Sequence, residues 1–546
     1  MSQQALWPIR DIAQQLNLSA SDIIEFSNNK AKLPLDIVYQ RPRRAKLVLM
    51  TSINPTPPGE GKTTMSIGLS QALRRLGIAA TAVLREPSMG PTFGMKGGAT
   101  GGGRSQAEPS TEINLHFTGD FHAITAAHNL LAALIDNELF HGSRLAADPS
   151  RVLWKRVLDV NDRALRHVVI GLGGPSQGVP RESGFDITAA SEVMAVLTLS
   201  SNLSDLKRRL GRMVIASQGG EMVTTSDIGA EDAMTALLSD AMMPNLVQTS
   251  EHTPVIMHGG PFANIAHGCN SIVATEAGLR LSDVVITEAG FGADLGAEKF
   301  LDIKAPLARL EPSLVVVVVT LRALRYHGGQ DLAHMAEPNL GALQEGMPNL
   351  LKHIENLHGF GLPVVIAINQ FANDSPEEIL WLVHELGTRG VPAAAADVFG
   401  QGGAGGLDLA RLVNKQLEND APVFTPLYAD ELPLTEKIER IVTRIYGGSG
   451  VEYSASAVGT LKKLHKWGEE GLKVCIAKTQ YSLSDDPKRL GCPQGFKVSI
   501  RDIDIARGAG YIVPLAGAMI RMPGLPKEPS AYHVKVDEAG VIYGIR

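Results

Sequence analysis

The chain has 546 residues, and its 51 basic and 57 acidic side chains give a formal net charge of −6 without any basic run. This balance excludes an extended nucleic-acid surface, and the length predicts two or three domains. The three cysteines, Cys269, Cys475 and Cys492, lie far apart, so we expect neither a disulfide framework nor a zinc motif, as is typical of a reducing cytosol.

The N-terminus lacks an apolar signal core, and the longest apolar run, residues 314–319, is too short to span a bilayer. A cytoplasmic protein without a membrane segment is therefore predicted.

The first part of the chain predicts an α/β fold. Residues 1–44 favour a helical N-terminal extension. From residue 45 to about residue 330, apolar runs alternate with amphipathic patterns, as in a mostly parallel sheet of the P-loop NTPase type. Buried parallel strands are expected, among other places, over residues 167–172 and 282–287.

A candidate phosphate-binding loop follows the first predicted strand, residues 45–53, and reads Thr56-Pro57-Pro58-Gly59-Glu60-Gly61-Lys62-Thr63-Thr64. It matches the pattern G-x-x-x-x-G-K-[ST] except at Thr56, which replaces the opening glycine. In this pattern the backbone wraps around phosphate oxygens, the lysine reaches the terminal phosphates and the next hydroxyl holds magnesium. A helix over residues 63–76 and a strand over residues 78–84 complete the unit that the mechanism requires. We expect residues 56–63 to bind nucleotide, and an incidental turn is the weaker alternative.

The predicted strand over residues 78–84 ends in Arg85-Glu86. Ligands of open α/β sheets lie beyond the carboxyl ends of the strands, so we expect this pair to point towards the nucleotide. Arg85 is favoured as a catalytic group that braces charge on a transferring phosphoryl group, over a structural ion pair. For Glu86, support of the arginine and a chemical role are equally open.

A glycine-rich segment, residues 94–104, follows the Arg85 strand and carries Lys96 and Arg104. Such a run cannot fill a core and is costly to order. Flexible linkers are usually polar and separate domains, whereas this run follows a predicted strand end directly. An anion-facing loop is therefore favoured.

A magnesium partner is predicted at the end of another strand, as in P-loop enzymes. Glu288 or Asp294 could supply it, and a helix cap is nearly as good an interpretation of Asp294. His258, which lies in a Gly-Gly-Pro setting, is interpreted as a structural histidine rather than a zinc ligand, and a substrate contact remains open for it.

The second half of the chain predicts three further parts. Residues 331–350 are interpreted as an exposed connector, a second α/β unit follows to about residue 495, and alternating β patterns begin at residue 496 and end in a hairpin. The predicted domains are therefore 1–330 for nucleotide, 331–495, and a small β-rich segment at 496–546.

These motifs carry a resemblance to the formate–tetrahydrofolate ligases that runs nearly end to end. The matching blocks include TPPGEGKTT, LREPSMGPTFGMKGGATGGG, EINLHFTGDFHAITAAHNLLAALIDN, NLVQTSEHTPVIMHGGPFANIAHGCNS, ITEAGFGADLGAEKF, LRALRYHGG, AKTQYSLSDDP and IRMPGLP. Three departures concern the glycine segment and an aromatic position: Thr100 and Arg104 replace an alanine and a tyrosine, and Phe399 stands where the family often has tryptophan. They put substrate affinity in question rather than the reaction class.

The resemblance implies ATP-dependent formation of 10-formyltetrahydrofolate from formate through formyl phosphate. It implies that residues 56–63 bind ATP, that Lys62 and Arg85 are catalytic, and that Mg²⁺ is held at Thr63. By composition alone, Phe371 and Phe399 would be core residues, but the resemblance implies that they stack on tetrahydrofolate in the second α/β unit. It also implies a homotetramer and activation by a monovalent cation.

Two other functions remain open from the residues alone. Deviant phosphate loops occur in nucleotide-switch ATPases and GTPases that control partners, and such a protein would hydrolyse nucleotide without folate. A P-loop ligase acting on a different carboxylic acid is the second alternative.

Overall fold

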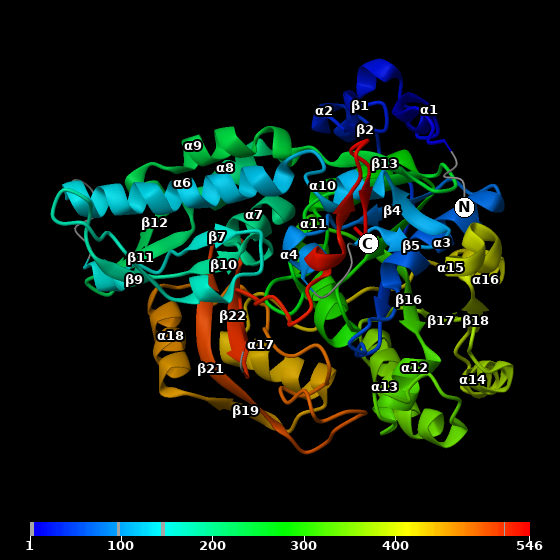
Figure 1. The fold of residues 1–546 in the computed structure, drawn as a ribbon. Coiled ribbons are helices and arrows are strands. Elements are labelled where there is room, and N and C mark those ends of the chain that lie inside the picture. The colour runs from blue at the N-terminus through cyan, green and yellow to red at the C-terminus, as the bar shows by residue number, and fades with distance from the viewer. Residues whose placement is uncertain (1–4, 95–98, 143–147, 518, 546) are drawn as a thin grey trace.

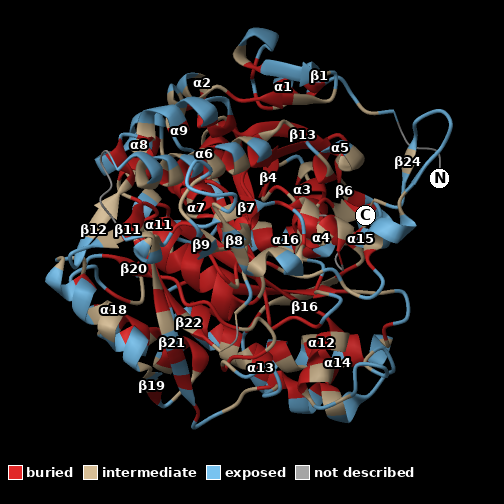
Figure 2. Cartoon of the chain, turned by 60° about the vertical axis from the view of Figure 1, so that its left-hand side comes forward, coloured by how far each residue is buried: buried red, intermediate tan, exposed pale blue. Residues whose placement is uncertain are grey.

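The computed structural model describes residues 5–94, 99–142, 148–517 and 519–545. It is a mixed α/β structure built around a large sheet, with a helical layer and a small sheet beside it (Figure 1). Figure 2 shows that buried residues fill the large sheet and the elements around it. No helix among the described residues is long and apolar enough to cross a membrane.

Within the described residues the large sheet has twelve strands, and ten of them form one continuous path. In spatial order these are β1 (Ile24–Ser27), β2 (Lys30–Lys32), β13 (Asn245–Thr249), β14 (Pro254–Met257), β4 (Ala80–Leu84), β15 (Val284–Glu288), β3 (Lys46–Ser52), β16 (Pro312–Val319), β17 (Val364–Asn369) and β18 (Ala393–Ala396). All pairs from β14 to β18 are parallel. Two short strands, β5 (Gly101–Gly102) and β6 (Ser105–Glu108), join at β13.

The central strands are continuous apolar runs because helices cover both faces of the sheet. Alternate residues of β3 and β16 belong to different cores. On one face Val48 and Met50 pack with α3 (Lys62–Arg75) and α16 (Leu407–Leu417). On the other face Leu47 and Leu49 belong to the core that contains α10 (Ile272–Leu281), α13 (Leu340–Gly359) and α14 (Pro376–Thr388).

A second core joins a helical layer to a small sheet. The layer comprises α6 (Asp120–His141), α7 (Glu192–Leu199), α8 (Leu203–Gly211) and α9 (Glu231–Leu238). The four-stranded sheet has the order β19 (Gly450–Tyr453), β21 (Lys497–Ala506), β22 (Tyr511–Ala516) and β20 (Lys473–Val474), with α17 (Leu434–Arg440) and α18 (Ala455–Lys466) beside it (Figure 1). A cavity of about 730 Å³ lies between these parts, with Trp154 and Tyr511 in its lining.

Smaller elements complete the chain. The short helices are α1 (Ile9–Gln14), α2 (Leu35–Tyr39), α4 (Met89–Phe93), α5 (Ser110–Asn114), α11 (Ala305–Ala308), α12 (Leu321–His327) and α15 (Val398–Gln401). Two-stranded ladders are formed by β7 (Arg156–Leu158) with β10 (Phe185–Ile187), β8 (Val168–Ile170) with β9 (Arg181–Ser183), β11 (Val214–Gln218) with β12 (Glu221–Thr224), and β23 (Lys535–Val536) with β24 (Ile542–Tyr543).

The predicted α/β class and its mostly parallel sheet are confirmed, as are the strand–helix–strand unit β3, α3 and β4 and the terminal hairpin. Three local predictions are wrong. The N-terminal extension is only partly helical, because β1 and β2 extend the edge of the large sheet. Residues 167–172 form a partly exposed antiparallel ladder, and the predicted connector becomes helix α13 from Leu340 onward, with Pro348 inside it.

The large sheet takes strands from both sides of residue 330, and the small sheet takes strands from both sides of residue 496. These two predicted boundaries therefore do not coincide with sheet boundaries. The division into three domains stays a prediction.

Candidate active site

The carboxyl ends of five neighbouring parallel strands meet at one edge of the large sheet, in the order β4, β15, β3, β16 and β17. β4 ends just before Arg85, β15 ends at Glu288, and β3 leads towards the loop at residues 56–63. β16 ends before Thr320, and β17 ends at Asn369. Ligands of open α/β sheets bind beyond such ends, so this edge is the candidate active site.

The loop before α3 depends on glycine at two positions. Gly59 has φ +85° and donates its N–H to the carbonyl of Thr56 at 2.9 Å, which closes a tight turn. Gly61 has φ +72°, and a Cβ there would lie 2.5 Å from Nδ2 of Asn369. Both the left-handed backbone and the close approach of Asn369 therefore require glycine at position 61.

The first residues of the predicted nucleotide loop use their side chains to shape the loop. The N–H and Oγ1 of Thr56 donate to Oε1 of Glu60 at 2.8 and 2.9 Å, and both residues are buried. Pro57 and Pro58 are exposed on the outer side of the turn. One oxygen of the Glu60 carboxylate thus bonds within the loop, and the role predicted for these residues in ATP binding stays a prediction that rests on their backbone.

Lys62 and Thr63 begin α3 with their side chains on the sheet side of the loop. Lys62 Nζ donates to Oγ of Ser52 at 3.2 Å, at the end of β3. Thr63 Oγ1 donates to Oε2 of Glu288 at 2.8 Å. The positive end of the helix dipole and an ammonium group therefore lie together at this edge, an arrangement that favours polyanions.

The predicted magnesium ligands Thr63 and Glu288 are brought together. Glu288 is almost fully buried, and among the described residues its Oε1 has no hydrogen-bond partner, although Arg85 Nε lies 3.9 Å away. A hydroxyl and a carboxylate are the hard oxygen donors that suit Mg²⁺. Asp294 does not join them, because its Oδ2 forms a buried ion pair with Lys478 at 2.7 Å.

Arg85 lies beside Glu288 at the candidate site. Its Nη1 donates to the carbonyl of Pro261 at 3.2 Å, and its Nε has no hydrogen-bond partner among the described residues. The side chain is 20% exposed. The guanidinium is therefore held in place and still presents donors towards the sheet edge, as the sequence predicts for a group that binds an anion.

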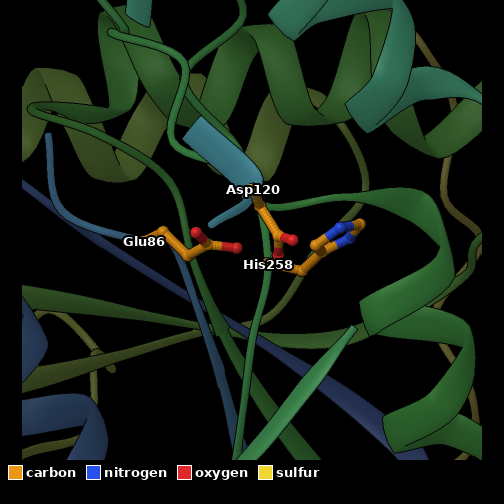
Figure 3. Close-up of side chains that lie close together, drawn as sticks. All are labelled: Glu86, Asp120 and His258. Carbon is orange, nitrogen blue, oxygen red and sulfur yellow. The ribbon is translucent and has the colours of Figure 1, made fainter. Parts of the chain in front are cut away.

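Glu86 belongs to a different, buried cluster, so the expectation that it points towards the nucleotide with Arg85 is not supported. Figure 3 shows that the side chains of Glu86, Asp120 and His258 lie close together. One possible ligand atom from each lies within 4.8 Å of the others. Oε1 of Glu86 accepts from the backbone N–H of Gly259 at 3.0 Å. Burial, and next the Asp120 carboxylate, raise the pKa of Glu86 well above its usual range.

Both ring nitrogens of His258 have hydrogen-bond partners outside the cluster of Glu86, Asp120 and His258. Its Nε2 donates to the carbonyl of Ala241 at 2.6 Å, and its Nδ1 lies 2.7 Å from Oγ of Ser271. Lys32 Nζ bonds Asp120 at 2.8 Å and supplies the counter-charge. Burial lowers the pKa of His258 to about 4, which describes a neutral structural histidine, as the sequence favours, without access for a substrate.

The two predicted aromatic residues lie in different settings near the loop. Phe399, on α15, is 57% exposed. Phe371 follows β17 and is half-buried. The guanidinium of Arg322 lies over the Phe371 ring, 4.2 Å from the centre of that ring. No ring–ring contact joins Phe371 to Phe399 in the described part of the chain.

The described end of the glycine segment packs against Phe399. A Cβ on Gly103 would lie 2.2 Å from the carbonyl oxygen of Phe399, so this position requires glycine. The N–H of Arg104 donates to the same carbonyl at 2.9 Å, and its side chain is exposed. Thr100 is buried and accepts from Asn114 at 3.2 Å. Lys96, predicted in an anion-facing loop, lies outside the described residues.

Sequence reasoning missed the polar groups that anchor Glu60 and the cation on Phe371. Oε2 of Glu60 accepts from Oγ1 of Thr320 at 2.5 Å, and the carbonyl of Glu60 accepts from Nδ2 of Asn369 at 3.0 Å. Both partners come directly at or after the end of a buried apolar run, the signal that identified Arg85 and Glu288. No comparable pattern in the sequence predicts that Arg322 lies over Phe371.

Asp159 fixes the segment that follows Arg85, and it supplies a test of pH dependence. Its Oδ1 accepts from Oγ of Ser88 at 2.6 Å and its Oδ2 from the N–H of Met89 at 2.9 Å, while burial raises its pKa to about 6. A raised carboxyl pKa means that folding is favoured at low pH and that this stability is lost as pH rises from about 4 through 6.

We therefore expect Asp159→Asn to become more stable relative to the parent as pH rises from 4 to 7, by about 2 kcal/mol. Comparing the two proteins across pH cancels the constant cost of the hydrogen bond that asparagine cannot replace. Chemical denaturation at several pH values measures the change, with Asp420→Asn at an exposed position as the matched control. A difference between Asp159→Asn and the parent that does not vary with pH would contradict this account.

Comparison with known proteins identifies the family of the chain. The family model described as formate–tetrahydrofolate ligase matches residues 1–546. A formate–tetrahydrofolate ligase of Limosilactobacillus fermentum (strain NBRC 3956 / LMG 18251) is 54% identical over 544 residues, which cover 100% of this chain and 98% of the relative. A formate–tetrahydrofolate ligase of Paracoccus denitrificans (strain Pd 1222) is 53% identical over 542 residues, which cover 98% and 97%. This chain therefore belongs to the formate–tetrahydrofolate ligase family.

Proposed function

We propose that the protein is an ATP-dependent ligase that joins formate to N10 of tetrahydrofolate and releases 10-formyltetrahydrofolate, ADP and phosphate, a reaction of one-carbon metabolism. Family membership over the whole chain supports this activity. The observation that carries the proposal is the meeting of Lys62, Thr63, Arg85 and Glu288 at one sheet edge.

Formate must first be activated, because its oxygen is a poor leaving group in acyl transfer. A formate oxygen attacks the γ-phosphorus of ATP, the bond to the β-phosphate oxygen breaks, and ADP leaves with that electron pair. Lys62 and the N-terminus of α3 offset the charge of the phosphates, and the backbone of residues 56–63 holds them. Arg85 orients formate and then stabilises the formyl phosphate, since its fork of N–H donors matches a carboxylate or a phosphate.

Thr63 and Glu288 would hold the Mg²⁺ that accompanies ATP, and the ion when bound neutralises charge on the phosphates. The protein's own contribution is to orient these two oxygen donors through the 2.8 Å hydrogen bond between them. Arg85 Nε, 3.9 Å from the same carboxylate, keeps the buried charge of Glu288 balanced.

The second step transfers the formyl group. The lone pair of N10 attacks the formyl carbon, the bond from that carbon to the phosphate oxygen breaks, and N10 loses its proton as phosphate leaves. Phe371 and Phe399 would place the folate ring system for this attack. We further propose a cytoplasmic homotetramer that is activated by a monovalent cation, with formate, ATP and tetrahydrofolate as its small-molecule substrates; these properties rest on the family resemblance.

One assay separates this function from the two alternatives. ADP release is measured with formate and tetrahydrofolate added singly and together, and 10-formyltetrahydrofolate is identified in the complete mixture. Sustained release only with both substrates is expected. Release that ignores both would instead describe a nucleotide switch, and release that requires a different acid would describe another carboxylate ligase.

Phe399→Ala is expected to raise the KM for tetrahydrofolate about two- to tenfold and to change kcat little, because an aromatic stack is worth about 0.5–1.5 kcal/mol. Phe399→Trp should lower that KM, since the larger ring restores the residue that the family often has. Steady-state kinetics with varied tetrahydrofolate measures both, and Phe140→Ala, at another exposed phenylalanine, is the control. An unchanged KM in Phe399→Ala would remove Phe399 from the folate site.

A further inference from the structure

We propose that Glu60 is a positioning residue that couples the nucleotide loop to the folate-stacking segment, so that each substrate strengthens binding of the other. This inference rests on the proposed function and deepens it, because it assigns communication between the two sites to one side chain. The contacts of Glu60 form a closed path that runs through both sites.

On the nucleotide side, Glu60 organises the loop from within. Its Oε1 accepts two hydrogen bonds from Thr56, from the backbone N–H at 2.8 Å and from Oγ1 at 2.9 Å. Glu60 is only 2% exposed, so water cannot replace these bonds. The position of the Glu60 carboxylate therefore depends on the conformation of residues 56–61, which would change when phosphates enter the loop.

On the other side, Glu60 contacts the ends of two strands outside the loop. Its Oε2 accepts from Oγ1 of Thr320 at 2.5 Å, directly after β16. Its carbonyl accepts from Nδ2 of Asn369 at 3.0 Å, the last residue of β17. A displacement of Glu60 would therefore shift both strand ends. Each hydrogen bond is buried, and breaking it would leave a polar group without a partner, which costs free energy.

These two strand ends carry the residues that meet at Phe371. Arg322 lies two residues after Thr320, and Phe371 lies two residues after Asn369. The guanidinium of Arg322 sits 4.2 Å from the centre of the Phe371 ring. The path from Glu60 through Thr320, Arg322, Phe371 and Asn369 thus returns to Glu60 and contains only three non-covalent junctions.

The contacts of Arg322 link the conformation of the nucleotide loop to the Phe371 ring. Its Nε is buried and has no hydrogen-bond partner among the described residues. The described contacts of Arg322 are the stack on Phe371 and an electrostatic interaction with the Asp374 carboxylate, and the stack would restrain a ring that we propose holds tetrahydrofolate. Ordering the loop by nucleotide would pre-order this ring, and by linkage tetrahydrofolate would strengthen nucleotide binding by the same factor.

The test measures the affinity of the full-length enzyme for ADP, with and without saturating tetrahydrofolate, by titration calorimetry. In the parent protein tetrahydrofolate should tighten ADP binding at least about fivefold, the lower end of typical coupling. Thr320→Val removes the hydroxyl that bonds Glu60 and should bring this ratio close to one, while ADP affinity without folate changes less than about threefold. Thr320→Ser should restore the ratio.

Two further variants separate coupling from damage to the fold. Thr320 also caps α12 by accepting from the N–H of Ala323 at 3.0 Å, so Ser454→Ala, which removes the equivalent cap of α18, controls for cap loss and should keep the parent ratio. Arg322→Met keeps the aliphatic stem and removes the cation over Phe371, and it should lower the ratio as Thr320→Val does.

A ratio that stays at the parent value in both Thr320→Val and Arg322→Met would overturn the inference and leave the proposed function intact. The same holds if the parent protein forms 10-formyltetrahydrofolate but shows no effect of tetrahydrofolate on ADP affinity. A parent protein that fails to bind tetrahydrofolate would overturn both the inference and the function.

Discussion

Lys62→Ala is expected to lower the rate of 10-formyltetrahydrofolate formation about a thousandfold, the upper end of what one preorganised electrostatic group contributes. The Lys62 ammonium lies at the start of α3, held 3.2 Å from Ser52 Oγ, where the γ-phosphate of ATP would carry the charge that builds up during transfer. Single-turnover kinetics with all three substrates measures the loss.

The loss in Lys62→Ala should affect ATP binding as well as turnover, because in the proposed mechanism the ammonium would contact phosphate both before and during the reaction. Lys497→Ala, at an exposed lysine on β21, is the matched control and should keep parent activity. Turnover in Lys62→Ala within about tenfold of the parent would refute the role of this lysine in phosphoryl transfer.

Arg85→Ala is expected to reduce formate-dependent ADP release about a thousandfold or more, as is found for arginines that stabilise a transferring phosphoryl group. In contrast to the Lys62 variant, its ADP affinity should stay within about threefold of the parent, a change of less than 1 kcal/mol. Arg85 reaches the site from β4 rather than from the loop, with its guanidinium next to Glu288. We therefore propose that it acts on formate and the γ-phosphoryl group rather than on ADP.

Arg85→Lys sharpens the test of this residue. Lysine keeps the positive charge but loses the planar fork that binds a carboxylate through two parallel hydrogen bonds. The KM for formate should therefore rise while some turnover returns. Initial rates with varied formate measure this, and Arg389→Ala, at an exposed ion pair with Glu385, is the control. A normal KM for formate in Arg85→Lys would contradict the orienting role.

Local patterns in the sequence were sufficient to predict the strand–helix–strand unit of β3, α3 and β4 at the centre of the fold. The apolar run at residues 45–53, the helical spacing after Lys62 and the run at residues 78–84 correspond to β3, α3 and β4 within one or two residues. These elements are encoded locally, because a run that is buried on both faces and a helix that begins after glycine leave clear periodic signals.

The neighbours of these elements depend on long-range pairing, which local patterns do not report. β15 lies between β3 and β4 although it comes about two hundred residues later in the chain. This insertion brings Glu288 to Thr63, a contact that the sequence suggested only as one of two options. The same limitation explains the wrong prediction for residues 167–172. The strand in this segment pairs with β9 in a separate two-stranded ladder rather than joining the large sheet.

The remaining differences between the predicted site and the site in the structure arise from the directions in which side chains point. Arg85 and Glu86 are adjacent, yet only Arg85 faces Glu288, while Glu86 enters the buried cluster with Asp120 and His258 (Figure 3). Glu60, predicted as part of the ATP site, turns its carboxylate to Thr56 and Thr320. Spacing within a motif cannot distinguish these directions, because they depend on partners from strands far away in sequence.

In the proposed first step an oxygen of formate attacks the γ-phosphate, and one isotope experiment tests this attack directly. Formate labelled with ¹⁸O in both oxygens is supplied with unlabelled ATP and tetrahydrofolate, and the released phosphate is analysed by mass spectrometry. If formyl phosphate forms and is then cleaved by N10, each phosphate carries one ¹⁸O and each formyl group retains the other. Phosphate without ¹⁸O, released together with 10-formyltetrahydrofolate, would contradict activation of formate by phosphoryl transfer.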